Sequence, residues 1–300
     1  MSVRPFVAEQ VGDVAAAHRV ARAAAHRLGL DEPVLLRVGS NALFAAGPAV
    51  VLRVGRVTAP PAAALALSTL LAGAGIRVPT VHSAIDDLDD EYAVLAVERV
   101  TPSSQPIDWE AVGAAVRAVH HVDPASAAAV YPLPKCSVFG HWDFAAMFDD
   151  VAVELGAAER VAVRAAVDRL AGWQQAAELA PQVVCHGDVH PGNVLMTADG
   201  PVVIDWDMLC AGPAAWDHAA LLTWEHRWGG DAGTYAGFAR GYGTDLTDDP
   251  LAQLLAEGRL LAATLMRCRA GRRDPVAADE ARRRLRYWLG DPDAPQWRAA

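Results

Sequence analysis

Four side chains able to do acid, base or metal chemistry are crowded into the stretch HGDVHPGN, residues 186–193. They are His186, Asp188, His190 and Asn193. A second segment, VIDWD, places two more carboxylates a short distance downstream. Carboxylate and carboxamide oxygens are the ligands that Mg²⁺ prefers, and a separate carboxylate can orient a hydroxyl group and take its proton.

The chain between the two segments predicts how these side chains meet. NVLMTADGPVVID is typical of a β-hairpin, because Asp-Gly between two apolar runs is a strong hairpin signal. If residues 198–200 form the loop, Asn193 lies opposite Asp205, with Cβ atoms ~4.5–5.5 Å apart. That pair suits a hard cation such as Mg²⁺ and leaves positions for phosphate. Asp188, on the preceding loop, can face the same cation, which is the arrangement that phosphoryl transfer needs.

The elements around the site change in character along the chain. A three-stranded antiparallel meander over PVLLRVGSNALFAAGPAVVLRVGR and two strands, PTVHSAI and EYAVLAVERV, dominate the first part. Helices are predicted at about 7–28, 60–74, 108–121, 141–156, 158–178, 214–226, 231–242, 249–270 and 275–289. The fold class is therefore α+β. The linker-like RVTPSSQP predicts a division into residues 1–100 and 101–300.

Composition narrows the class of protein. The 300 residues are 53% hydrophobic and 21% charged, as in globular proteins. No apolar run approaches the ~20 residues of a membrane-spanning helix, and no targeting segment is evident, so we expect a soluble, cytoplasmic protein without membrane contact. A net charge of -10 disfavours nucleic-acid binding. The four cysteines lack metal-type spacing and are expected to be reduced, buried thiols.

The motifs HGDVHPGN and VIDWD resemble those of the aminoglycoside phosphotransferase and choline kinase family, which has a two-lobed, protein-kinase-like fold. AVVLRVGR, AVHHVDP and AGPAAWDHAALL are similar to further family segments in the expected order. The resemblance implies an ATP- or GTP-dependent kinase that phosphorylates a small molecule. It implies Asp188 as catalytic base, Asn193 and Asp205 as Mg²⁺ ligands, and a supporting role for Asp207.

The resemblance also implies a nucleotide site in the first 100 residues. The phosphates would be approached by a loop of Gly39, Ser40 and Asn41 and bound by Arg53. The adenine or guanine base of the nucleotide would lie near Glu98 and Val100. An acid in the helix at 60–74 should pair with Arg53, yet no Asp or Glu occurs between Glu32 and Asp86. Three alternatives follow: Arg53 is held by nucleotide and backbone alone, a carboxylate from elsewhere reaches it, or the nucleotide binds poorly.

Three further polar residues have structural and functional interpretations. His186 is expected to brace the loop backbone rather than act as a base, and His190 either touches phosphate or holds the turn. Asp217 is expected to hydrogen-bond the catalytic loop from a helix.

The acceptor is expected between Asp188 and the helices after Asp207. Trp224 and Trp228 are one helical turn apart and could stack on a sugar or an ammonium group, although such spacing is more typical of a core. Glu225 and Asp231 could meet a cationic amine or simply be solvated. An antibiotic, amino sugar, choline, amino alcohol or nucleoside-like metabolite stays open, as does the oligomeric state.

Two other functions compete with this hypothesis. GDVH also resembles one block of calcineurin-like metallophosphoesterases, but their further metal-ligand blocks are missing from the sequence. A non-catalytic nucleotide-binding protein of the same fold would explain the missing helix acid, but not the retained Asp188, Asn193 and Asp205.

Overall fold

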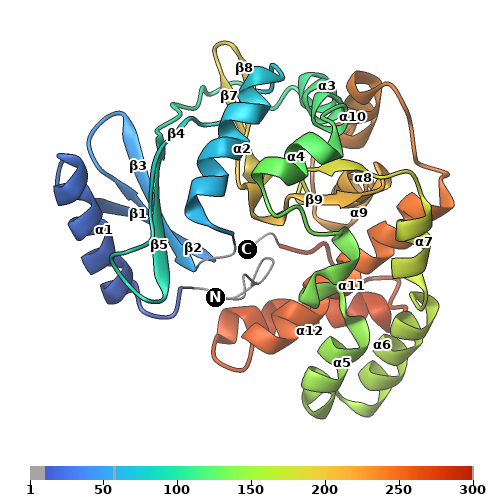
Figure 1. Cartoon of the computed structure of the whole chain (residues 1–300). Coiled ribbons are helices and arrows are strands. Elements are labelled where there is room, and N and C mark those ends of the chain that lie inside the picture. The colour runs from blue at the N-terminus through green and yellow to red at the C-terminus, as the bar shows by residue number, and fades with distance from the viewer. Residues whose placement is uncertain (1–10, 57–58, 299–300) are drawn as a thin grey trace.

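A five-stranded antiparallel sheet forms the first part of the molecule (Figure 1). The computed structural model describes residues 11–56 and 59–298. The strands are β1 (Val34–Val38), β2 (Asn41–Ala45), β3 (Val50–Arg56), β4 (Val81–Ile85) and β5 (Tyr92–Glu98), in the order β1-β2-β3-β5-β4. The predicted meander and the two further strands are confirmed, and β3 lies at the centre of the sheet.

Two helices accompany the sheet. Helix α1 (Val14–Leu28) begins at Asp13, whose side chain accepts the amide hydrogen of Ala16, and buries a row of alanines against Phe44 and Leu52. The start of the predicted helix at 7–28 lies outside the described residues. Helix α2 (Pro61–Gly73) packs on β4 and, through Leu67 and Leu71, on residues of the second part (Figure 1).

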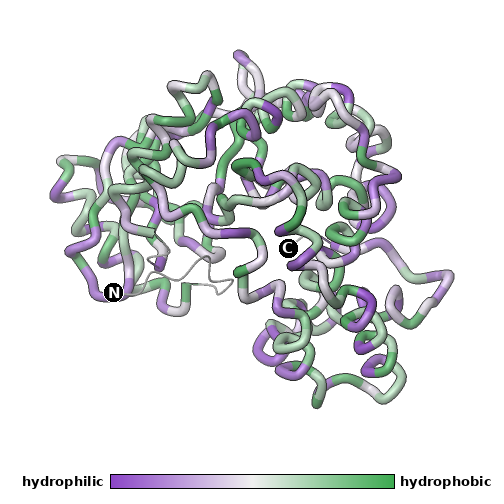
Figure 2. Tube along the Cα trace, turned by 45° about the vertical axis from the view of Figure 1, so that its right-hand side comes forward, coloured by the Kyte–Doolittle hydropathy of each residue, from purple (hydrophilic) through white to green (hydrophobic). Residues whose placement is uncertain are grey.

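Helices make up most of the second part. They are α3 (Trp109–His120), α4 (Pro124–Val130), α5 (Phe144–Val151), α6 (Ala157–Arg169), α7 (Trp173–Leu179), α8 (Ala215–Leu222), α9 (Trp224–Arg227), α10 (Thr234–Tyr242), α11 (Pro250–Ala270) and α12 (Pro275–Trp288). Hydrophobic and hydrophilic residues alternate along these helices (Figure 2), as expected where one face is buried. The main core stacks Trp142, Trp173 and Trp216 together. The α+β fold class, with a sheet in the first part and mainly helices in the second, is confirmed.

Several predicted helices are interrupted. The segment predicted as one helix at 158–178 is two, because Gly172 adopts φ 84°, which ends regular helix between α6 and α7. The stretch 141–156 contains only the short α5, flanked by 3₁₀ turns, and 214–226 is divided at Thr223. Helix α4, which begins at Asp123 and Pro124, was not predicted.

The predicted register of the site hairpin is wrong by one residue. β7 (Val194–Thr197) pairs with β8 (Gly200–Val203), and Thr197 lies opposite Gly200. The turn has two residues instead of three because Gly200 adopts φ 109°, which lets the second strand start earlier. Asn193 therefore faces Ile204, whose N–H donates to the Asn193 carbonyl at 2.9 Å, and Asp205 lies one position beyond.

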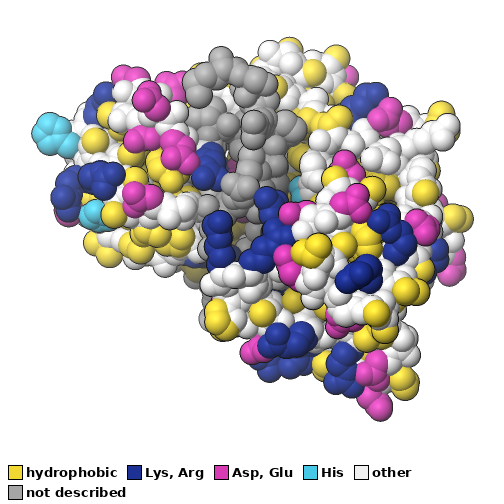
Figure 3. Space-filling view, turned by 90° about the horizontal axis from the view of Figure 1, so that it is seen from below, with side chains coloured by type: hydrophobic (Ala, Val, Ile, Leu, Met, Phe, Trp, Pro, Cys, Tyr) yellow, Lys and Arg dark blue, Asp and Glu magenta, His cyan; other side chains and the backbone are white. Residues whose placement is uncertain are grey.

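Other surface and boundary predictions have different outcomes. In the described part of the chain, every helix is too short or too polar to span a membrane. Basic and acidic side chains lie interspersed on the face seen in Figure 3, rather than in separate fields. The cysteines Cys136, Cys185, Cys210 and Cys268 are free and buried, as expected. The boundary between residues 1–100 and 101–300 stays a prediction.

Candidate active site

The residues of both motifs meet where two short sheets end. Strand β6 (Val183–Cys185) leads into His186 and pairs with β9 (Cys210–Gly212), while the β7–β8 hairpin holds the other side of the loop. The loop between β6 and β7 thus carries Asp188, and the segment between β8 and β9 carries Asp205 and Asp207. Two antiparallel pairs fix both segments at their ends.

Asp188 is surrounded by polar partners on both oxygens. Its Oδ2 accepts a hydrogen bond from Asn193 Nδ2 at 3.2 Å and lies 3.3 Å from His190 Nε2. Its Oδ1 accepts from Arg259 at 3.2 Å. Burial alone would raise the pKa of this carboxyl, but His190 and Arg259 together hold it below its usual range. Asp188 is therefore ionised and oriented near neutral pH.

The predicted metal ligands keep oxygens available. Asn193 uses its Nδ2 for the carbonyl and carboxylate of Asp188, and no described residue donates to its Oδ1. The Asp205 carboxylate is 41% exposed, and its Oδ1 lies 3.5 Å from the guanidinium of Arg53. Burial, followed by the charge of Asp207, raises the pKa of Asp205 to about 6. A divalent cation would relieve this repulsion, so the oxygens present fit Mg²⁺.

Asp205 also has an unusual backbone. Its φ of 64° makes it the one non-glycine residue with positive φ in the described ranges. Such a conformation costs of the order of 1–3 kcal/mol and persists only where surrounding contacts impose it. It lets the chain leave β8 and enter the 3₁₀ turn Trp206–Met208 at once, which turns Asp207 toward the five-stranded sheet.

Asp207 supplies the carboxylate that helix α2 lacks. It forms an ion pair with Arg53 of β3, and its Oδ2 accepts a hydrogen bond from Asn41 Nδ2 at 3.0 Å. Gly55 makes room for this contact, because a Cβ there would lie 1.8 Å from the Asn41 side-chain oxygen. Of the three alternatives for Arg53, the structure shows the second: a carboxylate from elsewhere in the chain reaches it.

His186 braces the loop, as expected. The ring is fully buried, its Nδ1 accepts the Asp188 N–H at 3.2 Å, and its Nε2 lies 3.0 Å from the Ile204 carbonyl. Since the amide can only donate, Nδ1 is the unprotonated nitrogen and Nε2 donates. Burial lowers the pKa of His186, so the ring is a neutral link between the two segments.

Asp217 of α8 holds the same loop through its backbone amides. Its oxygens accept the N–H groups of His186 and Gly187 at 2.8 and 2.7 Å, and its Oδ2 lies 2.9 Å from His120 Nε2. His120, Cys185 and Asp217 also bring three potential metal-ligating atoms within 4.8 Å of one another. Both oxygens of Asp217 already accept hydrogen bonds from the loop backbone and from the imidazole. We therefore interpret the cluster as a support for the loop rather than as a metal site.

The contact between His120 and Asp217 predicts a pH dependence of stability. Burial opposes protonation of His120, but the bond to Asp217 raises the pKa of the imidazole to about 10, compared with about 6.5 in an unfolded chain. The folded state therefore binds the extra proton between these values. We expect the stabilisation from this pair to be fully present below about pH 6.5 and to be lost as the pH rises toward about 10, so the free energy of unfolding should fall over this range.

The variant His120→Gln should remove this dependence and cost about 3–5 kcal/mol, because it leaves a buried carboxylate without its cation. Urea unfolding at several pH values measures both effects. His121→Gln, the adjacent and exposed histidine, is the matched control. A wild-type stability that does not change over this pH range would contradict a protonated His120 beside Asp217.

The predicted acceptor residues separate into two groups. The ring of His190 stacks on Trp224 at a centroid distance of 5.9 Å, and Trp224 stacks on Trp228 at 5.6 Å. Trp228 also packs on Trp297 and under the buried guanidinium of Arg284. Trp224 therefore lies next to the loop, whereas Trp228 belongs to the packing behind it.

The two acids considered for a cationic acceptor do not meet at the loop. Glu225 accepts the N–H of Tyr235 at 3.3 Å and so contacts the start of α10. Asp231 is exposed, and its carbonyl accepts from the Thr234 hydroxyl at 2.8 Å. The contacts thus favour the structural interpretation of Glu225 and leave Asp231 solvated.

The segment predicted to bind the adenine or guanine base of the nucleotide lies at a pocket of about 550 Å³. Glu98 and Val100 line it together with residues that follow α2 and residues of the β7–β8 hairpin. The Arg99 amide donates to the Ala49 carbonyl at 2.8 Å and the Glu98 amide to Thr80 at 2.8 Å, whereas the Val100 N–H has no partner among the described residues. The phosphate-loop candidates Gly39 and Ser40 form the tight turn between β1 and β2.

The phosphotransferase enzyme family model matches residues 46–255, which is more than half of the chain and includes every residue of the two motifs. The chain belongs to this family. No curated protein matches the sequence.

Solved structures of phosphotransferases and of a choline/ethanolamine kinase family protein share the fold of this phosphotransferase, so the predicted kinase-like fold is confirmed. The apo form of a thermostable mutant of the aminoglycoside phosphotransferase APH(4)-Ia is 16% identical, with a TM-score of 0.65 over 91% of this chain and 99% of that one. A choline/ethanolamine kinase family protein from Mesorhizobium loti is 19% identical, with a TM-score of 0.62 over 92% and 96%. Spectinomycin phosphotransferase APH(9)-Ia, in complex with ADP and spectinomycin, is 16% identical, with a TM-score of 0.60 over 89% and 90%.

Two residues that support the loop of the phosphotransferase, Arg259 directly and His120 through Asp217, were not predicted as site residues. Arg259 lies 71 positions after Asp188, and His120 lies 97 positions before Asp217. A signal for Arg259 exists in the sequence, because GR interrupts the apolar run of the helix predicted at 249–270. AVHHVDP was recognised as a family segment, but nothing in it distinguishes His120 from His121.

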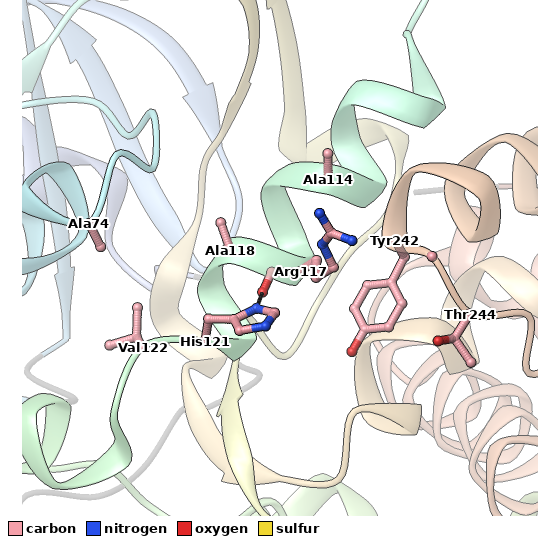
Figure 4. A pocket seen from close by; sticks show the side chains of 9 residues that line it. Ala74, Ala114, Arg117, Ala118, His121, Val122, Tyr242 and Thr244 are labelled. Carbon is pink, nitrogen blue, oxygen red and sulfur yellow. Dashed lines mark hydrogen bonds between the residues drawn. The ribbon is translucent and has the colours of Figure 1, made fainter.

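A second pocket of the phosphotransferase, of about 870 Å³, has no residue of the 186–193 loop in its lining (Figure 4). It is lined by Arg117 of α3, by His121 just after that helix, by Tyr242 and Thr244 at the end of α10, and by Ala74 after α2. One of its lining residues, Tyr242, has its hydroxyl 2.8 Å from Nδ1 of His120.

Proposed function

We propose that the protein is a kinase that transfers the γ-phosphate of ATP or GTP to a hydroxyl group of a small molecule, with Mg²⁺. The observation that carries the proposal is the convergence of Asp188, Asn193 and Asp205 on one end of the hairpin, where Arg53 pairs with Asp207 and lies 3.5 Å from Asp205. The family supports phosphoryl transfer, and the neighbours crystallised with ADP or GDP support a nucleotide donor.

Each residue has a distinct role in this proposal. Asp188 accepts a hydrogen bond from the acceptor hydroxyl and takes its proton, while Asn193 and Asp205 hold the metal. Mg²⁺, when bound, neutralises the charge of the transferred phosphate. Arg53 binds phosphate oxygens, which its planar fork can contact in pairs, and the free Val100 N–H donates to the nucleotide base. Most of the acceleration then comes from positioning and charge neutralisation.

The acceptor is proposed to lie between Asp188 and Trp224. The His190–Trp224 stack offers one flat wall beside the base, which suits a ring or an ammonium group. Among the structural neighbours, one was crystallised with spectinomycin, one with kanamycin, one is a macrolide 2'-phosphotransferase, and another is a choline/ethanolamine kinase family protein. Antibiotics, amino sugars, choline and amino alcohols are therefore the candidate acceptors.

The experiment is Mg²⁺-dependent release of ADP and GDP across these acceptor classes and nucleosides, with Asp188→Asn as the comparison. A product formed by the wild type and lost in the variant supports both the acceptor class and the base. Nucleotide binding without turnover on any acceptor would favour the non-catalytic alternative.

Arg53 gives a prediction for nucleotide binding. Arg53→Ala removes one charged phosphate contact and leaves Asp207 without its ion-pair partner beside the phosphates. A hydrogen bond to a charged group contributes about 1.5–3 kcal/mol, so we expect the dissociation constant for ATP to rise by about 10- to 100-fold. Acceptor choice should not change.

Isothermal titration calorimetry measures this effect. Arg56→Ala is the matched control, because Arg56 lies on the same strand and pairs with Glu91 instead. Unchanged ATP affinity in Arg53→Ala would contradict the assignment of Arg53 to the phosphates.

The non-catalytic alternative was motivated by the absence of an acid in helix α2. Because Asp207 pairs with Arg53 instead, that absence no longer favours a non-catalytic protein.

A further inference from the structure

Arg259 reaches the proposed base from a distant helix. It lies in the middle of α11, and its side chain is only 13% exposed. One terminal nitrogen donates to Asp188 Oδ1 at 3.2 Å, and the other donates to the Gly187 carbonyl. The two donors of one planar group thus hold both the carboxylate and the backbone that carries it.

The packing around Arg259 fixes its position. Its guanidinium carbon lies 5.6 Å from the ring centre of Trp216 and 5.9 Å from that of Trp142. Gly258 lets α11 approach these rings, because a Cβ there would lie 2.7 Å from Trp142. An arginine stays charged in such surroundings, and a guanidinium packs well beside aromatic rings. The side chain is therefore placed before any substrate arrives.

The other contacts of Asp188 come from its own loop. His190 and Asn193 approach Oδ2, whereas Oδ1 meets Arg259. Within the described residues, Arg259 is the contact to this carboxylate from outside residues 186–193. Without it, the loop would hold one oxygen, and the carboxylate plane could turn about that contact.

We propose that Arg259 is a positioning residue for phosphoryl transfer, which fixes the carboxylate plane of Asp188 so that the acceptor hydroxyl meets it in line with the phosphate. The proposal rests on the kinase function proposed above. Arg259 acts through Asp188 and contacts neither nucleotide nor metal. A misplacement of about 1 Å at a reacting group can cost about 100-fold in rate, which sets the size of the expected effect.

The experiment combines three variants, Arg259→Gln, Arg259→Lys and Asp188→Asn, with the double variant of Arg259→Gln and Asp188→Asn. Transfer is measured with the acceptor found in the panel, and acceptor-free ATP hydrolysis provides a second readout. We expect Arg259→Gln to lower kcat by about 10- to 100-fold, with nearly unchanged KM for ATP. Arg259→Lys should keep more activity, because the ammonium retains the charge beside Asp188.

The double variant separates positioning from a general structural role. If Arg259 acts through Asp188, replacing it in the Asp188→Asn background lowers kcat little further, so the two losses do not multiply. Arg269→Gln, on the same helix but exposed and near Asp150, is the matched control and should behave as the wild type. Calorimetric ATP affinity of each variant reports whether the nucleotide site remains intact.

Two results would overturn the inference alone: a kcat for Arg259→Gln within about twofold of the wild type, or losses that multiply fully in the double variant. The first shows that Asp188 needs no second support, and the second that Arg259 acts independently of it. Absence of any transfer by the wild type would overturn the proposed function, and this inference with it.

Discussion

Asp188→Asn is expected to lower kcat for phosphoryl transfer by about 10²–10⁴-fold, the range typical of a lost general base. The amide keeps the shape of the side chain and can still accept a hydrogen bond, but it cannot take the proton of the acceptor. The nucleotide should bind nearly as before, because Asp188 contacts neither Arg53 nor Val100. Initial rates and calorimetric ATP affinity measure the two effects separately.

Asp168→Asn is the matched control for this variant. Asp168 lies on α6 and is exposed, so the same chemical change there should leave kcat unaltered. A kcat for Asp188→Asn within a few-fold of the wild type would show that another group takes the proton. The proposed roles of His190 and Arg259 around the carboxylate would then need a different explanation.

Asp205→Ala is expected to abolish turnover while leaving the fold intact. Loss of a metal ligand should remove activity at ordinary Mg²⁺ concentrations. The pKa of Asp205, raised to about 6 by burial and by Asp207, means that the ionised carboxylate is disfavoured in the folded protein. Above that pH the charge opposes folding, whereas alanine tolerates the positive φ of this position less well than aspartate does. The two effects oppose each other, so the unfolding temperature should change little near neutral pH.

A Mg²⁺ titration of the rate, together with thermal unfolding, tests both parts. Asp205→Asn, which keeps one oxygen, should recover part of the activity at high Mg²⁺. Full activity of Asp205→Ala at ordinary Mg²⁺ would contradict the assignment of this residue to the metal. A large drop in unfolding temperature would instead show that Asp205 stabilises the fold.

The sequence predicted those parts of the site whose residues are close together in the chain. The loop at 186–193 and the segment at 203–207 lie on either side of one hairpin, so local spacing nearly determines their arrangement. The register was still wrong by one residue, because a glycine with positive φ can join the strand or the turn, and composition alone does not distinguish these. The helix break at Gly172 was missed for the same reason.

Contacts between distant segments could not be predicted in this way. The pairing of Arg53 with Asp207 spans 154 positions and joins the five-stranded sheet to the hairpin end. The sequence shows only that α2 lacks an acid, which leaves several alternatives open. Arg259 reaches the loop from α11 beside Trp142 and Trp216, and His120 reaches Asp217 from α3. Packing between helices that are distant in the chain has no signature in local periodicity.

The contacts of Asp217 divide the catalytic loop into two dynamic parts. The amides of His186 and Gly187 donate to the buried carboxylate of Asp217 on α8. This start of the loop can therefore open only when the helical core itself unfolds. Farther along, Gly192 donates only to the ring of His190, a partly exposed side chain. Rearrangements that admit and release substrates should therefore start at the loop tip, while Asp188 stays anchored at the rigid end.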